Sequence, residues 1–260
     1  MTLRSVLELI LMVYRPPRQR NLYDPGSQKP FKLSRTRLER FIECPRCFYL
    51  DRRLGVDRPP GFPFNLNSAV DTLLKTEFDI YREIKEPHPD YMQSHGIDAI
   101  PFQHPDLYDW RNNFKGVQHL HESTNLLIHG AVDDVWESST GELIVVDYKA
   151  TSKNSAVSLD AEWQRSYKRQ IEIYQWLLRR NGFDVSNTGY FIYCNGNRQR
   201  EEFAQHLQFE VSVLPYTGTD TWVEDTIINA HHCLQSESAP ELLERGCYYC
   251  TYYLARLDAE

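Results

Sequence analysis

The sequence predicts an α/β (α+β) fold in which helices flank a central β-sheet. Three features predict it: residues Gly130–Lys149 fit a β-hairpin, residues Trp163–Arg180 carry apolar side chains at helical spacing, and two later apolar runs fit strands. Those runs are Thr188–Cys194 and Glu202–Val213. With 260 residues, 41% of them hydrophobic, the chain is long enough to bury the core of one sizeable domain.

The first 31 residues are expected to form a helix and a linker ahead of the main domain, which takes residues 32–255. Apolar residues recur at helical spacing up to Tyr14, and Pro16 and Pro17 end that helix. Glu8 interrupts the apolar run and no small-residue cleavage site follows, so a signal peptide is not expected and the cytoplasm is the expected location. No apolar segment reaches the length of a membrane span, so a membrane is not expected as a partner.

Two helices and a connection are predicted before the hairpin. Ser34 has the side chain of a helix N-cap, and the helix that it starts leads to the cysteine-containing stretch at Cys44. Residues Asn67–Lys85 place apolar side chains at helical spacing. Pro87–Pro105 is rich in Pro, His and Asp and predicts an extended connection, which a partly helical or irregular stretch follows.

Residues 126–149 predict the hairpin itself. The apolar residues from Leu126 to Val135 predict its first strand, Ser138–Gly141 has the composition of a turn, and Leu143–Val146 predicts the second strand. Asp133 and Asp147 are therefore expected on neighbouring strands.

An acid–acid–amine group is expected at one edge of this hairpin. Because side chains alternate along a strand, Asp147 and Lys149 point to one side and Tyr148 points to the other. By the same alternation Asp134 points away from Asp133 and is expected as a solvent-side or supporting group. Two carboxylates and an ammonium suit a hard divalent cation such as Mg²⁺ together with an attacking water.

The helix after the hairpin carries a second pair of polar residues. Gln170 and Tyr174 lie one helical turn apart and therefore share a face. Beyond the two later strands, Thr221–Leu234 predicts another helix. The core order is thus strand, strand, helix, strand, strand, with helices before and after it.

The pattern G-x-x-D in Gly130–Asp133, a hairpin, and then D-Y-K in Asp147–Lys149 resembles the PD-(D/E)XK nuclease superfamily. The later Q-x-x-x-Y in Gln170–Tyr174 resembles the RecB-like exonuclease branch of that superfamily, at about the expected separation. This resemblance implies a restriction-endonuclease-like core with a central mixed β-sheet. It also implies a DNA nuclease that uses Mg²⁺ or Mn²⁺, acting as an exonuclease on single strands or ends.

The resemblance implies roles for individual residues as well. Asp133 and Asp147 would bind the metal, with the Tyr148 carbonyl as a third ligand. Lys149 would orient or deprotonate the attacking water and steady the developing charge. Gln170 and Tyr174 of the helix motif would contact Lys149, the metal-bound water or the DNA backbone.

One position departs from the family pattern. RecB-like enzymes often carry a metal-binding His in the helix before the sheet, and the matching stretch Asn67–Leu74 has Asp71 there. A carboxylate can bind a hard cation, so Asp71 is a candidate metal ligand; the alternative is a polar residue on the helix surface. Loss of the His favours a second interpretation, a catalytically silent nuclease-derived module that binds DNA or a protein. The retained acids and lysine favour the enzyme.

Charge is unevenly distributed along the chain. The net charge is −7, but Arg15 to Arg58 holds twelve Lys or Arg against five Asp or Glu, so this segment carries +7 and the remainder −14. A basic segment is suited to phosphates, and the candidate nucleic-acid contacts are Arg35, Arg37 and Arg46; a solvated surface without a partner is the alternative. Because no P-loop or helicase motif occurs, any ATP-driven motor would be a separate helicase or a recombination or CRISPR-type protein.

Four of the six cysteines form two C-x-x-C pairs, Cys44 with Cys47 and Cys247 with Cys250. In an intracellular chain such pairs indicate metal binding or burial rather than disulfides. Two pairs that share one metal site would tie the start of the domain to its end.

The iron–sulfur members of the same nuclease branch, including CRISPR-adaptation nucleases, use such a staple, with one cysteine in a C-P-R stretch and three near the C-terminus. Cys44–Arg46 matches the C-P-R stretch, whereas the last cysteine of the pattern would fall near Arg256 and is absent, so Cys47 is expected to replace it. The resemblance favours a [4Fe–4S] cluster and the symmetric pairing favours Zn²⁺, with the cluster preferred. Four unligated thiols are the alternative. Cys194 and Cys233 are expected in the core.

Overall fold

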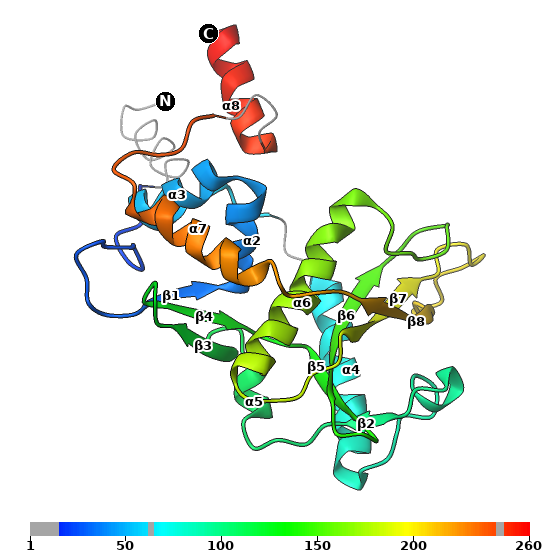
Figure 1. The fold of residues 1–260 in the computed structure, drawn as a ribbon. Helices are drawn as coiled ribbons and strands as arrows, with labels where there is room; N and C mark the ends of the chain where they lie inside the picture. The colour runs from blue at the N-terminus through cyan, green and yellow to red at the C-terminus, as the bar shows by residue number, and fades with distance from the viewer. Residues whose placement is uncertain (1–15, 62–64, 243–246) are drawn as a thin grey trace, which may run out of the picture.

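The computed structural model describes residues 16–61, 65–242 and 247–260, so the helix predicted for residues 1–14 lies outside the described part. Two sheets are present there, one with the strand order β2–β5–β6–β7–β8 and one with the order β1–β4–β3 (Figure 1). The strands are β1 (Phe31–Ser34), β2 (Ala99–Pro101), β3 (Val117–His121), β4 (Leu126–Gly130), β5 (Asp134–Ser138), β6 (Leu143–Thr151), β7 (Thr188–Gly196) and β8 (Phe209–Thr217). The α-helices are α2 (Arg35–Glu43), α3 (Pro45–Leu54), α4 (Asn65–Ile84), α5 (Leu107–Trp110), α6 (Arg165–Arg180), α7 (Val223–Gln235) and α8 (Tyr248–Ala259).

The larger sheet is mixed. Strands β5 and β6 form the predicted antiparallel hairpin, with the Gly141 amide donating to the Ser138 carbonyl at 2.9 Å in the turn. Strand β7 lies parallel to β6, and α6 makes the crossover between them, as a parallel connection requires. Strand β8 returns antiparallel to β7. The predicted α/β (α+β) class with a central mixed sheet is confirmed.

Helices cover the two faces of this sheet (Figure 1). On one face, Val145 and Phe191 pack in a core that also contains Ile171 of α6. On the other face, the alternate residues pack in a second core around Phe78 of α4 and the buried Trp136. The alternation of side chains along β6 and β7 therefore supplies both cores.

A helical group stands beyond the smaller sheet. Ser34 is the N-cap of α2, as predicted, and its hydroxyl oxygen accepts a hydrogen bond from the Arg37 amide at 3.3 Å. Figure 1 shows α2, α3 and α7 gathered beside β1, with α8 beyond them. The helices predicted from Asn67, Trp163 and Thr221 are confirmed as α4, α6 and α7. Among the described residues, no helix is both long and apolar enough to cross a bilayer.

The prediction of one continuous first strand for the hairpin is wrong, because residues 126–138 form two strands. β4 ends at Gly130 and belongs to the smaller sheet, and β5 starts only at Asp134. A Cβ atom on Gly130 would lie 2.5 Å from Cε1 of Tyr174, so the chain passes very close to α6 where it leaves β4. Asp133 therefore lies in the short connection before β5 rather than within a strand.

Three further differences concern strands. β2 lies in the stretch predicted as an extended connection, and β3 lies where a partly helical or irregular stretch was expected. The strand predicted from Glu202 starts only at Phe209. Ala204 and Gln205 have φ values of 43° and 61°, which an extended strand cannot contain.

Candidate functional site

Strand β6 presents two charged side chains to α6. Asp147 is fully buried, its Oδ1 accepts a hydrogen bond from Gln170 Nε2 at 2.5 Å, and its Oδ2 forms an ion pair with the Lys149 ammonium. The hydroxyl of the intervening Tyr148 points to the opposite face, where it donates to Asp134 at 2.9 Å. The side-chain alternation predicted for these residues is confirmed.

Asp133 reaches the same strand from the connection before β5. Its Oδ2 accepts a hydrogen bond from the Tyr148 backbone amide at 2.9 Å, which places its carboxylate against the residue that follows Asp147. The Asp133 side chain is 21% exposed, whereas that of Asp147 is 0% exposed. One acid of the pair is thus open to an approaching ligand and the other is enclosed.

The electrostatics of the pair follow from this burial. Burial raises the pKa of Asp147 to about 7; the Lys149 ammonium opposes this shift, and the negative charge of Asp133 reinforces it. Burial alone would lower the pKa of Lys149, but the carboxylates of Asp147 and Asp133 raise it above its ordinary value. Lys149 is therefore a protonated ammonium at neutral pH.

The donor set fits a hard divalent cation. The buried Asp147 Oδ2 pairs with the Lys149 ammonium, and a carboxylate oxygen paired in this way keeps a lone pair with which it can also bind a cation. Carboxylate oxygens are the ligands that Mg²⁺ and Mn²⁺ prefer. The acids are less tightly gathered than the cysteines, because within the described ranges only the cysteine group brings three or more candidate ligands within 4.8 Å of one another.

Helix α4 adds Asp71 and a lysine to this region. The Lys75 ammonium lies 2.8 Å from Asp71 Oδ1 and 3.6 Å from Asp133 Oδ1, so it stands between the two carboxylates. Burial raises the pKa of Asp71, and the charge of Asp133 raises it further. Sequence reasoning missed Lys75, although its position one helical turn after Asp71 was a readable signal.

Helix α6 supplies the polar residues that hold Asp147. Gln170 Nε2 lies 3.2 Å from the Tyr174 hydroxyl as well as within hydrogen-bond distance of Asp147. The ring of Tyr174 packs against Gly130, where a side chain would collide with it. The first residue of the G-x-x-D pattern therefore makes room for the last residue of the Q-x-x-x-Y pattern.

Asp134 belongs to a separate charge network. It is fully buried on the far face of β6, where it forms ion pairs with Arg82 and Arg111 and accepts the Tyr148 hydroxyl. The solvent-side position considered for Asp134 is wrong. Its two arginine partners offset the cost of burying this carboxylate in the core.

The three candidate arginines differ in their surroundings. Arg37 forms ion pairs with Asp51 and Asp57, and Arg46 donates to the Pro240 carbonyl at 2.7 Å. Arg35 lies next to the acids, since its positive charge acts on Asp147, and its buried Nε has no hydrogen-bond partner among the described residues.

Much of the basic segment is paired internally. The buried Asp51 forms ion pairs with four arginines, namely Arg18, Arg37, Arg40 and Arg52. The charge of +7 counted in the sequence therefore overstates what is available to a phosphate.

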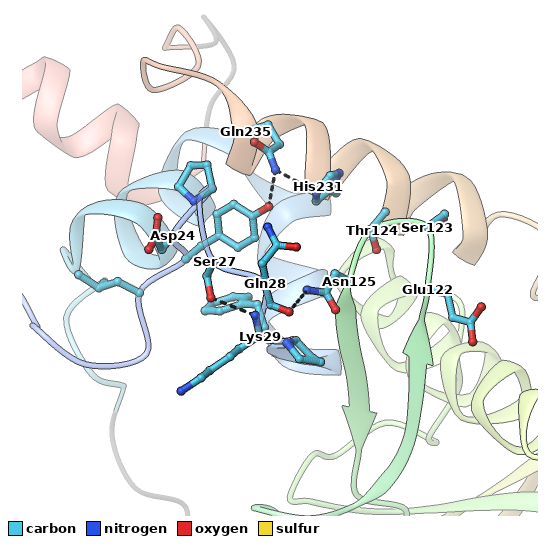
Figure 2. Close-up of a pocket in the computed structure, with 15 residues that line it drawn as sticks. Asp24, Ser27, Gln28, Lys29, Glu122, Ser123, Thr124, Asn125, His231 and Gln235 are labelled. Carbon is cyan, nitrogen blue, oxygen red and sulfur yellow. Dashed lines mark hydrogen bonds between the residues drawn. The ribbon is translucent and has the colours of Figure 1, made fainter.

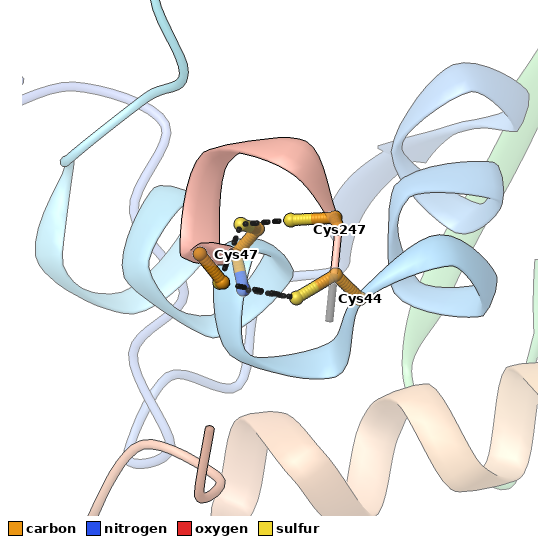
Figure 3. A group of neighbouring side chains, drawn as sticks. Cys44, Cys47 and Cys247 are labelled. Atoms are coloured by element: carbon orange, nitrogen blue, oxygen red, sulfur yellow. Dashed lines mark hydrogen bonds between the residues drawn. The ribbon is translucent and has the colours of Figure 1, made fainter. Parts of the chain in front are cut away.

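The four cysteines of the two C-x-x-C pairs lie together, although some 200 residues separate the pairs (Figure 3). The sulfur of Cys47 is 3.4 Å from that of Cys247 and 3.7 Å from that of Cys250. Cys194 and Cys233 are not part of this cluster. Burial raises the pKa of each of their thiols to about 11, as is typical of unreactive structural cysteines. Sequence reasoning missed Arg58, whose guanidinium lies beside the cluster.

A pocket of about 320 Å³ lies apart from the acids, between the β3–β4 turn, the segment before β1 and α7 (Figure 2). Its lining is mostly polar, and Gln235 Nε2 donates to the Tyr23 hydroxyl at 2.6 Å across one side. Asn125 Nδ2 donates to the Gln28 carbonyl at 3.1 Å across another side. These contacts tie the segment before β1 to the sheet and to α7.

Comparison with known proteins gives one family match. A family model described as the PD-(D/E)XK nuclease superfamily matches residues 32–253. A solved structure described as the crystal structure of SSO0001 is similar at 13% sequence identity, with a TM-score of 0.39, over 96% of this chain and 91% of that chain. No curated protein matches the chain.

Proposed function

The chain belongs to the PD-(D/E)XK nuclease superfamily, and on that premise we propose that it is a divalent-metal-dependent DNA nuclease that hydrolyses phosphodiester bonds. Members of this superfamily are generally metal-dependent nucleases. We further propose that the chain belongs to the RecB-like branch and degrades DNA from single strands or ends. The observation that carries the proposal is the fully buried Asp147, enclosed by Gln170 and Lys149 beside the more open Asp133.

The acids hold the catalytic cation in this proposal. Asp133, Asp147 and the Tyr148 carbonyl are the ligands of Mg²⁺ or Mn²⁺. Asp71 is linked to Asp133 by Lys75, whose ammonium pairs with both carboxylates. The bound ion would neutralise charge on the scissile phosphate and activate the attacking water. Gln170 fixes the orientation of the Asp147 carboxylate, and Tyr174 in turn positions the Gln170 amide.

Lys149 acts as a cation in this scheme. The neighbouring carboxylates raise its pKa, so it is charged at neutral pH and does not accept a proton from water. Its ammonium instead orients the water and stabilises the negative charge that develops on the phosphate. We propose that Arg35, whose positive charge acts on Asp147, contacts a DNA phosphate beside the site.

A cleavage assay tests the proposal directly. Labelled single-stranded and duplex DNA are incubated with the purified chain in Mg²⁺, Mn²⁺ or EDTA, next to Asp147→Asn and Glu142→Gln variants. Glu142 lies in the turn of the same hairpin, so its variant is the matched control. We expect metal-dependent cleavage that Asp147→Asn lowers by about 100-fold or more and Glu142→Gln leaves unchanged. Circular single strands should resist cleavage if ends are required.

A catalytically silent binding module is the second candidate, and Lys75 favours it. Its ammonium stands between Asp71 and Asp133, where a positive charge competes with a catalytic cation. Metal-dependent cleavage no greater than that of Asp147→Asn, combined with retained DNA binding, would support the silent module and contradict the enzyme.

The domain and its partners complete the proposal. We propose that residues 32–255 form one nuclease domain that the four-cysteine cluster closes by holding a metal centre. We propose a separate helicase or a recombination or CRISPR-type protein as the partner that supplies any ATP-driven unwinding.

A further inference from the structure

The four sulfurs of the cysteine cluster are spaced as for one central ion (Figure 3). Cys44 and Cys250 have their sulfurs 3.7 Å apart, Cys47 and Cys247 have theirs 3.4 Å apart, and all four lie within 4.8 Å of one another. Four thiolates at the corners of a tetrahedron around zinc stand about 3.8 Å apart, because each Zn–S bond is about 2.3 Å long. The observed spacing agrees with that tetrahedron.

The same spacing does not fit the [4Fe–4S] cluster that the family resemblance favours. In a cubane each cysteine binds a different iron, so the four thiolates surround a core of eight atoms instead of a single ion. Three of the sulfur pairs are 3.4–3.7 Å apart and all four sulfurs lie within 4.8 Å of one another, which leaves no room for that core. Helices α3 and α8 would have to move apart to admit it.

The two cysteine pairs are built alike, as two halves of a zinc site. Cys44 is the N-cap of α3 and Cys247 is the N-cap of α8, and in each case the second cysteine lies three residues later in the first helical turn. The Cys47 amide points to the Cys44 sulfur at 3.5 Å. Each helix thus presents two sulfurs from one rigid turn, near the end of the helix dipole that stabilises negative charge.

Arg58 supports the charge of this group. Four thiolates and one Zn²⁺ carry a net charge of −2, and the Arg58 guanidinium lies beside Cys47 and Cys247. Arg58 is itself held by Glu43, whose Oε2 accepts from Nη1 at 2.6 Å. Outer contacts of this kind stabilise charged metal–thiolate centres.

We propose that the four cysteines bind one structural zinc ion instead of an iron–sulfur cluster, and that this ion fastens α8 to the start of the domain. The inference does not depend on the proposed nuclease function, because the cluster lies on different elements from the acids of β6. It departs from the centre that the family resemblance implies, for the reason of spacing given above.

The metal content of the full chain tests the inference. The Asp147→Asn variant is purified from iron-supplemented cells with and without oxygen, so that a metal at the acidic site cannot be mistaken for the cluster. We expect one zinc per chain, no acid-labile sulfide and no broad visible absorbance in either preparation. X-ray absorption at the zinc edge should show four sulfurs at about 2.3 Å.

Cysteine variants assign the ion to the cluster. Cys247→Ser should lose most of the bound zinc, whereas Cys194→Ser, at a buried cysteine outside the cluster, and Cys233→Ser, at a half-buried one, should keep one zinc per chain. Iron and sulfide in a 4:4 ratio in the anaerobic preparation would overturn the inference, and so would an intact chain that holds neither metal. Both readouts come from purified protein without DNA, so failure of the nuclease proposal is a separate result.

Discussion

Gln170 Nε2 donates a hydrogen bond to Asp147 Oδ1 at 2.5 Å and joins the middle of α6 to the middle of β6. The Asp147 carboxylate is fully buried, so this bond and the Lys149 ion pair together fix its orientation. The second oxygen of Asp147, Oδ2, faces the Lys149 ammonium. Gln170 and Lys149 therefore each hold one oxygen of the acid.

Gln170→Leu should lower cleavage by about 10–100-fold, as is typical when a residue that orients a metal ligand is lost. The matched control is Gln175→Leu on the same helix, whose amide donates to the Ser186 carbonyl away from the acids. Rates of DNA cleavage and thermal unfolding are measured for both variants. Equal activity in the two variants would remove Gln170 from the site.

Gly130→Ala should damage both stability and activity. The added Cβ would lie 2.5 Å from Cε1 of Tyr174, so the ring and the Gln170 amide that it contacts must shift. We expect the free energy of unfolding to fall by about 1–3 kcal/mol. Gly61→Ala, where a Cβ meets nothing within 4 Å, is the control for the urea unfolding measurement.

Substitution of the adjacent acids Asp133 and Asp134 by asparagine should have opposite effects, one mainly on cleavage and the other mainly on stability. Asp134→Asn removes the buried carboxylate that Arg82 and the half-buried Arg111 share in the core, and should cost about 3–5 kcal/mol of stability. Asp133→Asn keeps an acceptor for the Tyr148 amide at a partly exposed position, so stability should change by less than about 1 kcal/mol while cleavage falls by about 100-fold. Urea unfolding and cleavage rates measured on both variants decide between these outcomes.

Lys75→Met should strengthen divalent metal binding. Removing an ammonium that lies 3.6 Å from Asp133 Oδ1 removes about 1 kcal/mol of repulsion toward the ion, equivalent to about fivefold in the dissociation constant for Mn²⁺. Lys115→Met breaks an exposed lysine–aspartate pair with Asp109 and serves as the control. Calorimetric titration with Mn²⁺ measures both. Unchanged or weaker binding in Lys75→Met would show that Lys75 does not compete with the ion.

His129 should make the fold sensitive to acid. Burial, and secondarily Lys32, lowers its pKa to about 4 in the folded chain, against 6.5 for an unperturbed histidine. The unfolded chain therefore binds the extra proton first, and the folded state is fully stabilised only above pH 6.5. By pH 5 this group alone should lower the free energy of unfolding by about 2 kcal/mol. His129→Gln should lack this component, and urea unfolding of both chains between pH 8 and pH 5 measures the difference.

The sequence by itself determined the order of the core, strand, strand, helix, strand, strand, because apolar period and turn composition are local properties. It also determined that Asp147 and Lys149 share a face, since alternation along a strand needs no tertiary information. The break between β4 and β5 was not readable, because it depends on how closely Tyr174 approaches Gly130.

Only the tertiary structure decided which charges meet. Asp51 forms ion pairs with arginines of the segment that the sequence predicted to contact nucleic acid. Asp134 forms ion pairs with arginines far from it in the chain. Lys75 enters the acidic site because α4 packs beneath β6, and the sulfurs of two distant pairs close to within contact. Charge pairing and ligand spacing are properties of distance between remote segments, so a linear pattern can name the residues but cannot fix the partners or the size of the ion that they enclose.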